Sequence, residues 1–204
     1  MSTGRPREFD FDTALEAALL VFWRKGYEGA TLPDLTAAMG INRPSLYAAF
    51  GNKEALFRKA MDRYVETHAQ HVRDAVAQPT ARGVAQQLWA GTIELTAGSR
   101  FPRGCFLVQA VLVCGDAADC VRSEVARQRS QLDEVLRTRF ERALAEGDLP
   151  PQARPADLAK YVATVNHGIA VQASGDATRA ELLRVAELAL GVWPASMEAG
   201  QGGA

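Results

Sequence analysis

Apolar residues recur along the chain at helical spacing, and glycines, prolines and small polar residues separate the apolar stripes. Between residues 31 and 57 this pattern predicts two short helices and the start of a third. Thr31 with Asp34 three positions later has the spacing of a capping box, and Gly40 suits the left-handed position that ends a helix. Two helices joined by a tight glycine turn are typical of a helix-turn-helix, whose second helix lies in the major groove of DNA.

The second helix of this pair is expected at 43–50, with Asn42 as its cap. Leu46 and Phe50 fall on one stripe and are expected to face the protein. The outward face then consists of small and hydrogen-bonding residues: Arg43, Pro44, Ser45, Tyr47 and Ala48. An arginine on such a face suits a guanine edge and an alanine suits a thymine methyl group, whereas the tyrosine and the serine suit phosphate oxygens.

Lys53 gives an independent indication of DNA binding. It follows Asn52, the expected cap of the third helix, and so lies in the first helical turn. A cation there opposes the helix dipole at a cost of about 0.3–1 kcal/mol, which a phosphate bound at the same N-terminus would offset. The alternative is a solvated lysine balanced by Glu54. Beside the rest of the pattern we favour the phosphate contact.

The run GATLPDLTAAMGINRPSLYAAFGNKEALF resembles the DNA-binding motif of the TetR family of bacterial transcription regulators. The preceding run ALEAALLVFWRKGYEGAT resembles the first helix of that family, and together the likeness covers residues 9 to about 60. The matching positions are Thr31, Gly40, Leu46, Tyr47, Phe50, Lys53 and Glu54. The resemblance adds Thr31 to the expected DNA contacts. It implies a regulator, most commonly a repressor, that leaves an inverted-repeat DNA operator when a small-molecule effector enters its C-terminal domain.

A basic arm precedes this motif, with Arg5 and Arg7 on either side of Pro6. An arm ahead of a helix-turn-helix can enter the adjacent minor groove, as homeodomain arms do. A frayed, solvated tail is the equal alternative, since position is the only evidence.

The first helix is expected from about Thr13 to Lys25, with Asp12 as its cap. Apolar residues at helical spacing along it should form the core of the small domain: Phe11, Leu15, Ala18 and Phe22. The fourth helix starts near Lys53 and is expected to continue well past His68, because nothing breaks the pattern before position 78.

The remainder of the chain keeps the helical pattern and shows no β alternation. Further helices are expected at 84–95, 105–114, 121–144, 155–175 and 178–192. We therefore expect an all-α fold of about nine helices, in which an N-terminal three-helix helix-turn-helix domain precedes a C-terminal helical domain for ligand binding and dimerisation. The expected divisions are a basic arm at 1–8, the DNA-binding domain at 9–60, the C-terminal domain at 61–194 and a disordered tail at 195–204.

Composition changes this picture little. The chain has 204 residues, of which 48% are hydrophobic and 23% charged, and its net charge is −1. These values are ordinary for a globular protein and give no bulk signal for nucleic acid, so the case for DNA depends on where a few charges lie. No membrane span or signal peptide is evident, and we expect a cytoplasmic protein without a membrane partner. Three cysteines cannot all pair within the chain, and their scarcity excludes a small disulfide scaffold.

The last two helices are rich in small residues, with alanines at 159, 163, 170, 173, 186 and 189. Two such helices can pair with their symmetry mates in a four-helix bundle. The resemblance implies such a homodimer, which a helix-turn-helix protein needs to read two half-sites. The alternative is that these faces pack only within one subunit.

Enzymatic and metal-binding functions receive little support. His68 and His71 have helical i, i+3 spacing, but no carboxylate or cysteine completes a metal site, so we expect surface histidines and no metal. No phosphate loop, nucleophile elbow or dinucleotide fingerprint is present, and we expect no cofactor and no catalysis. An all-α adaptor that binds a protein partner is the main alternative, although it leaves the outward arginine, tyrosine and lysine unexplained. An all-α enzyme is less favoured still.

A ligand pocket in the C-terminal domain would draw on its polar and aromatic residues. The candidates are Trp89, Phe101, Phe106, Tyr161, Asn166 and His167. Each is individually more common as an ordinary core or surface residue. His167, next to Asn166 within an apolar helix, is the best single candidate because a polar pair there needs partners.

Cys105 follows Arg103 and Gly104 and is expected to open the apolar helix at 105–114. A thiol at a helix N-terminus beside an arginine is favourably placed for thiolate chemistry. Gly104 and Cys105 also resemble the glycine–cysteine pair of a TetR-like branch that responds to electrophiles or oxidants. A buried, inert thiol is the favoured alternative, and neither Cys114 nor Cys120 has a comparable setting.

Overall fold

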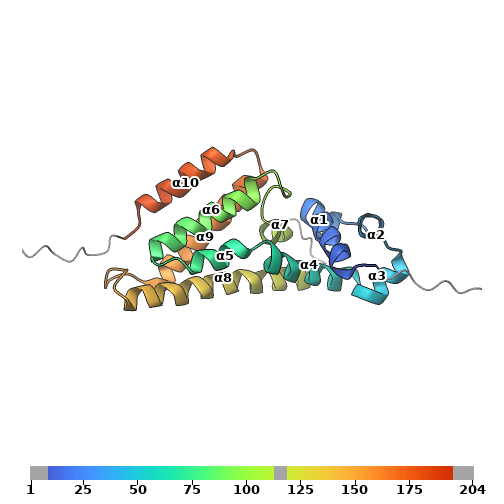
Figure 1. Cartoon of the computed structure of the whole chain (residues 1–204), viewed down its shortest axis with the longest axis horizontal. Helices are drawn as coiled ribbons and strands as arrows, with labels where there is room; N and C mark the ends of the chain where they lie inside the picture. Colours follow the sequence, from blue (N-terminus) through green and yellow to red (C-terminus); the bar gives the residue numbers. More distant parts are fainter. Residues whose placement is uncertain (1–8, 113–118, 195–204) are drawn as a thin grey trace, which may run out of the picture.

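The computed structural model describes residues 9–112 and 119–194, and all regular structure in these ranges is helical. Ten helices follow one another: α1 (Phe11–Gly29), α2 (Leu32–Met39), α3 (Arg43–Phe50), α4 (Lys53–Thr67), α5 (Gln70–Val76), α6 (Ala81–Ala97), α7 (Phe106–Leu112), α8 (Asp119–Ala145), α9 (Pro155–Ser174) and α10 (Arg179–Gly191). Figure 1 shows α1, α2 and α3 together at one end of an elongated molecule, with α8 running along one edge and α10 at the far side. The all-α prediction is confirmed. The arm at 1–8 and the tail at 195–204 lie outside the described residues.

The first helix begins earlier than expected. Asp10, not Asp12, is its N-cap, and the Asp10 carboxylate accepts a 2.6 Å hydrogen bond from the backbone N–H of Thr13. At the other end the helix kinks at Gly26, whose φ of 69° suits a residue without a side chain, and continues to Gly29. Phe11 is 41% exposed rather than buried, although its ring stacks on Phe50 with the centroids 4.3 Å apart.

The caps of α2 and α3 follow the sequence pattern. Thr31 and Asp34 form both hydrogen bonds of the capping box, and Gly40 adopts φ 67° at the turn. The side chain of Asn42 accepts a hydrogen bond from the backbone N–H of Ser45 at the start of α3. These short-range bonds satisfy backbone groups that a helix end leaves free, and they fix the turn between the two helices.

The expected long fourth helix is wrong, because the chain breaks between α4 and α5 at His68 and Ala69. No glycine or proline stands there. Arg73 instead turns back and donates hydrogen bonds to the carbonyl oxygens of Val65 and Glu66, at 3.4 and 2.9 Å, which α4 leaves free at its end. This break accounts for the tenth helix.

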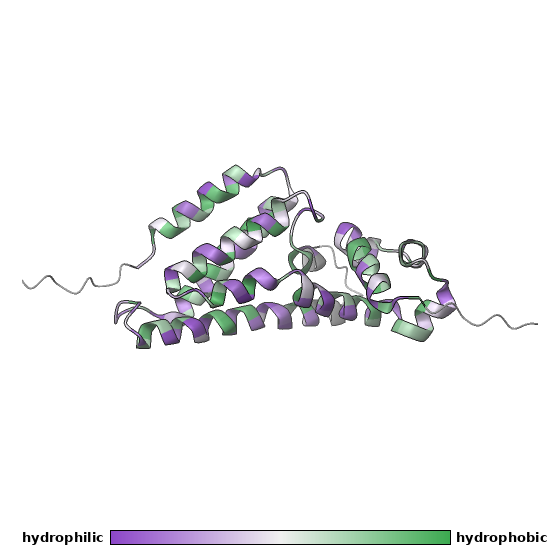
Figure 2. Ribbon diagram, viewed as in Figure 1, coloured by the Kyte–Doolittle hydropathy of each residue, from purple (hydrophilic) through white to green (hydrophobic). Residues whose placement is uncertain are grey.

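Two clusters of buried side chains organise the molecule. The first combines α1 to α4 with Phe106 and Val125, and the second spans α5, α6 and α8 to α10 around Trp89 and Phe140. Figure 2 shows apolar and polar positions alternating along α8, as expected for a helix that covers a core with one face. Each large apolar side chain buried in these clusters stabilises the fold by about 1.5–3 kcal/mol.

The remaining helices lie close to their expected positions. α7 begins at Phe106, so Cys105 precedes the helix rather than opening it. Thr178 and Glu181 form a second capping box at the start of α10. Within residues 9–112 and 119–194, no helix combines the length and apolar character needed to cross a membrane.

Candidate DNA-binding surface and interior cavity

The outward face of α3 carries the residues expected to contact DNA. These side chains are exposed or, for the serine, half-buried: Arg43, Pro44, Ser45, Tyr47 and Ala48. Tyr47 is 49% exposed, whereas Leu46 and Phe50 on the opposite face are buried. The buried face anchors the short helix, and the hydrogen-bonding face is therefore held outward on a rigid support.

Thr31 lies at the start of α2 with its hydroxyl already engaged. The hydroxyl donates to the carboxylate of Asp34 at 2.7 Å and accepts from the backbone N–H of the same residue at 3.2 Å. The ammonium of Lys25 in α1 contacts this carboxylate at 2.7 Å and, with the hydrogen bonds from Thr31, lowers the pKa of Asp34 to about 2. The carboxylate thus joins α1 to the beginning of α2.

Lys53 has a partner inside the protein that the sequence did not indicate. Its ammonium lies over the ring of Tyr27, 4.6 Å from the centroid. Burial lowers the pKa of Lys53, and the carboxylate of Glu28 opposes this shift. The aromatic contact positions the cation at the N-terminus of α4, next to α3. Arg5 and Arg7 fall outside the described residues.

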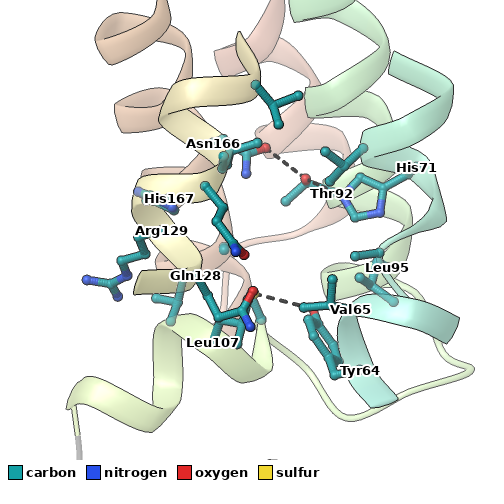
Figure 3. A pocket seen from close by; sticks show the side chains of 18 of the residues that line it. Tyr64, Val65, His71, Thr92, Leu95, Leu107, Gln128, Arg129, Asn166 and His167 are labelled. Carbon is teal, nitrogen blue, oxygen red and sulfur yellow. Dashed lines mark hydrogen bonds between the residues drawn. The ribbon is translucent and has the colours of Figure 1, made fainter. Parts of the chain in front are cut away.

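A cavity of about 770 Å³ lies in the C-terminal part of the molecule, between helices α4 to α9. Figure 3 shows Thr92, Asn166 and His71 at one end of this cavity and Tyr64 and Leu107 at the other. Most of its lining is apolar. A volume in this range is typical of sites for small organic ligands.

A chain of hydrogen bonds crosses the first end of the cavity. The hydroxyl of Thr92 in α6 donates to the side-chain oxygen of Asn166 in α9 at 2.7 Å, and Nε2 of His71 in α5 lies 3.1 Å from the same hydroxyl. Burial lowers the pKa of His71 and favours its neutral form. Thr92 was not among the expected pocket residues, because its only signal in the sequence is a hydroxyl on the buried face of a helix.

Cys105 lines the other end of the cavity. Its sulfur lies 3.3 Å from the hydroxyl of Tyr64 in α4, and burial raises the pKa of that phenol well above its usual value. The guanidinium of Arg103 does not accompany the thiol, because it donates to the carbonyl oxygens of Ala173 and Ala177 at 3.0 and 2.8 Å. Cys105 therefore lies at the N-terminus of α7, where its carbonyl oxygen accepts from the backbone N–H of Gln109 at 2.9 Å, but without the expected arginine beside it.

Of the six candidate pocket residues, Asn166 and His167 line the cavity and the other four do not. Burial, followed by the nearby Arg129 guanidinium, lowers the pKa of His167. The other four have structural contacts elsewhere. Trp89 and Tyr161 donate hydrogen bonds to the carbonyl oxygens of Val162 and Ala189, at 3.1 and 2.8 Å.

The remaining two candidates, Phe101 and Phe106, pack on the N-terminal helices. The ring of Phe101 is nearly parallel to that of Trp23, with the centroids 5.8 Å apart, and Phe106 belongs to the first core. Both aromatic rings therefore belong to the junction between the N-terminal helices and the cavity-bearing part of the molecule.

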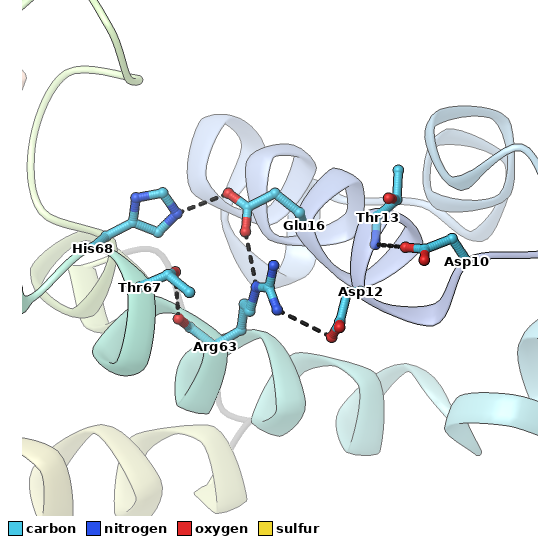
Figure 4. Close-up of polar contacts among 7 residues, drawn as sticks. All are labelled: Asp10, Asp12, Thr13, Glu16, Arg63, Thr67 and His68. Carbon is cyan, nitrogen blue, oxygen red and sulfur yellow. Dashed lines mark hydrogen bonds and ion pairs between the residues drawn. The ribbon is translucent and has the colours of Figure 1, made fainter.

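A second polar cluster joins α1 to the end of α4. Figure 4 shows Glu16 between Arg63 and His68, with Arg63 also reaching Asp12. The carboxylate of Glu16 lies 2.7 Å from His68 Nε2 and 3.1 Å from Arg63 Nε. His68 and His71 thus serve different clusters, and no group of three metal-ligating side chains occurs among the described residues.

Exposed apolar side chains gather on α9 and α10. The most exposed are Leu188 at 76% and Val192 at 71%, and Val171 and Val185 are also uncovered. Val185 and Leu188 lie on α10 beside the face of the buried Leu182 and Ala186, and Val192 follows at the C-cap of the helix. The two helices therefore present an apolar face that no part of the described chain covers.

Comparisons with known proteins agree with this architecture. The family model for bacterial regulatory proteins of the tetR family matches residues 14–60, and the model for the tetracyclin repressor-like C-terminal domain matches residues 85–187. The HTH-type transcriptional repressor ComR of Escherichia coli (strain K12) is 32% identical over 199 residues, covering 95% of this chain and 93% of ComR.

Solved structures of TetR-family regulators are also similar to this chain. The TetR family transcriptional regulator CifR, as a cysteine mutant complexed with 26-bp double-strand operator DNA, is 43% identical with a TM-score of 0.89 and covers 93% of this chain and 100% of that one. A TetR regulator from Rhodococcus sp. RHA1 is 41% identical with a TM-score of 0.58, covering 89% and 97% of the two chains. The present chain therefore belongs to the TetR family, a family of regulators rather than enzymes, and is a DNA-binding transcriptional regulator.

Proposed function

We propose that the protein is a repressor that binds an inverted-repeat operator as a homodimer, with α3 of each subunit in a major groove. The exposed face of α3, from Arg43 to Ala48, carries this proposal. The operator complex of CifR supports it, because a chain of the same fold and 43% identity is complexed with operator DNA. Lys53 then contacts a phosphate at the start of α4, and Thr31 lies at the edge of the interface. A bacterial repressor meets its operator in the cytoplasm, and we place the protein there.

The apolar face of α9 and α10 supplies the dimer contact in this proposal. Its exposed side chains, Leu188 foremost, would be covered by the same face of a second copy in an isologous four-helix bundle. The two-fold axis through this bundle then relates the two α3 helices, as recognition of two half-sites requires.

An effector that enters the interior cavity ends repression. The cavity touches α4 at Tyr64 and the loop before α7 at Cys105, and α4 carries the DNA-binding helices on its other end. A ligand, or a reactive electrophile or oxidant at Cys105, would displace these contacts and shift α4, which changes the separation of the two α3 helices.

DNA binding is tested with labelled DNA from upstream of the gene that encodes the protein. Fluorescence anisotropy should give saturable binding to that DNA, with at least a thousandfold preference over a shuffled duplex. Footprinting should locate two half-sites one helical turn apart or a multiple of it. Equal affinity for both duplexes would contradict the proposal and favour the adaptor alternative.

A further inference from the structure

Buried polar side chains concentrate around the cavity. Four polar residues of the described chain are less than a tenth exposed, and all four line this one space: Thr92, Thr96, Gln128 and Asn166. Leaving a buried polar group without a partner is unfavourable, so such groups are normally hydrogen-bonded. Their partners therefore indicate which hydrogen-bonding capacity is left for a ligand.

Most of that capacity is used within the protein. Thr96 donates to the backbone oxygen of Thr92 at 2.6 Å, and Thr92 donates its only hydroxyl hydrogen to the side-chain oxygen of Asn166. Nε2 of His71 lies 3.1 Å from the same hydroxyl, and the tautomer of the imidazole decides which of these two atoms donates. The bond from Thr92 holds the side-chain oxygen of Asn166 toward α6.

Two groups remain: the amide oxygen of Gln128, whose nitrogen donates to Glu124 at 3.4 Å, and the amide nitrogen of Asn166. The Asn166 nitrogen carries two hydrogens, and no acceptor within the described residues takes either of them. Asn166 is 8% exposed and lines the cavity, and its oxygen is fixed by Thr92. Figure 3 shows this pair at one end of the space. Because the oxygen is held, the nitrogen is oriented in advance as a donor to a ligand.

Most of the cavity wall around this donor is apolar. Apolar side chains such as Val72 and Leu95 make up much of the wall. Among the charged lining residues, Arg73 is engaged by backbone oxygens of α4, and Arg127 pairs with Glu124. Among the residues that the structure describes, the buried Nε of Arg129 has no hydrogen-bond partner, and the guanidinium is directed away from the space in Figure 3.

We propose that the cavity binds an uncharged, largely apolar molecule with one hydrogen-bond-accepting group, such as a ketone carbonyl, held by the amide nitrogen of Asn166. This rests on the proposed function only in taking the cavity as the effector site. A carbonyl oxygen accepts what the asparagine offers, and an apolar body matches the walls. A carboxylate ligand would bring a charge into a largely apolar space, and burial there lowers the pKa of both His71 and His167.

Three probes of similar size test the proposal by calorimetry without DNA: phenyl propyl ketone, butylbenzene and 4-phenylbutanoate. The wild-type protein should bind the ketone about fivefold more tightly than butylbenzene, the gain expected of one neutral hydrogen bond. In Asn166→Leu the ketone should lose this advantage, while butylbenzene binds at least as well as before. Tyr161→Phe, on the same helix but outside the cavity, is the matched control and should keep the fivefold preference.

The comparison of ketone and hydrocarbon on the wild-type protein needs no variant, so poor folding of Asn166→Leu cannot rescue the proposal. Equal affinities, tightest binding of the carboxylate, or no binding of any probe would each overturn it. Operator release is measured separately by anisotropy. Selective ketone binding without release would leave the ligand class standing and contradict the proposed mode of regulation.

Discussion

The indole nitrogen of Trp23 in α1 donates a 2.9 Å hydrogen bond to the carbonyl oxygen of Gly104, the neighbour of Cys105 in the cavity wall. The two residues are 81 positions apart, and Trp23 is 1% exposed. The same indole packs edge-on against Tyr64, with the centroids 4.9 Å apart. One buried side chain of the DNA-binding helices thus contacts both the loop and the helix that close one end of the cavity.

Trp23→Phe should uncouple effector binding from operator release. The variant retains an aromatic ring but leaves the buried oxygen of Gly104 without its donor, so the free energy of unfolding should fall by about 1–3 kcal/mol. Operator affinity without effector should change little. The effector concentration needed for half-release should rise several-fold, as measured by anisotropy.

Trp89→Phe is the matched control. Trp89 is also fully buried and also donates to a backbone oxygen, that of Val162, but both residues lie in the second core. Its loss of stability should be similar and its release curve normal. If the two variants release DNA alike, the bond between Trp23 and Gly104 has no role in coupling.

Arg43→Ala and Lys53→Ala should weaken operator binding in different ways. Loss of an arginine that reads a base should cost about 1–3 kcal/mol of binding free energy and relax preference at one position of each half-site. Loss of the lysine should weaken all sequences alike and reduce the slope of affinity against salt by about one unit per contact. Titrations at several salt concentrations on single-base operator variants separate these effects.

Arg142→Ala, on α8 far along the chain, is the control for general charge loss. Because Lys53 also lies over Tyr27, its variant is checked for unfolding before binding is compared. Operator affinity and salt slope unchanged in both variants would contradict the assignment of α3 and the start of α4 to DNA.

Local signals in the sequence predicted the helix-turn-helix well. The capping box of Thr31 and Asp34 and the turn at Gly40 each depend on residues that are close together in the sequence. The local sequence pattern is therefore enough to predict where these helices begin and end. The break after α4 could not be predicted in this way. It depends on Arg73 reaching back to free carbonyl oxygens and on His68 contacting Glu16 in another helix.

The cavity was harder to predict than the α3 surface. An outward face follows from the 3.6-residue period of one helix, whereas six helices must pack before a space between them has a lining. Trp89 and Tyr161 are residue types that often line pockets, but both pack in the second core. Thr92, which does line the cavity, has no distinguishing neighbour in the sequence. Asn166 was identified because a polar residue in an apolar stripe needs a partner.

Leu188→Glu should disrupt the dimer. A carboxylate on the exposed apolar stripe of α10 would have to be buried, with its mate from the second subunit, at the two-fold interface. Light scattering after size exclusion should show a shift to monomer and loss of operator affinity. Thr138→Glu, at an exposed position of α8, should remain dimeric. A Leu188→Glu protein that stays dimeric would show that another face is used.

The contact between Lys25 and Asp34 should produce a specific acid dependence. The folded-state pKa of about 2 lies below the ordinary 3.8, so the contact adds stability above about pH 4 and loses it as the pH falls toward 2. The difference in unfolding free energy between wild type and Asp34→Asn should therefore shrink across that range. In a Lys25→Met background the difference should be smaller at neutral pH. A constant difference down to pH 2 would contradict the assignment.

Oxidation of Cys105 should release the operator if the thiol acts as a sensor. Hypochlorite converts a thiolate to a sulfenic acid, forming an S–O bond as chloride leaves. With the sulfur 3.3 Å from the Tyr64 hydroxyl, the added oxygen must displace that contact or extend into the cavity. Either change acts on α4 next to Trp23. Wild type and Cys114→Ser should therefore lose operator affinity on treatment with mild hypochlorite, and a thiol reductant should restore it, whereas Cys105→Ser should hold DNA. If all three proteins release DNA equally, or none does, Cys105 is a structural residue that packs as a small apolar side chain.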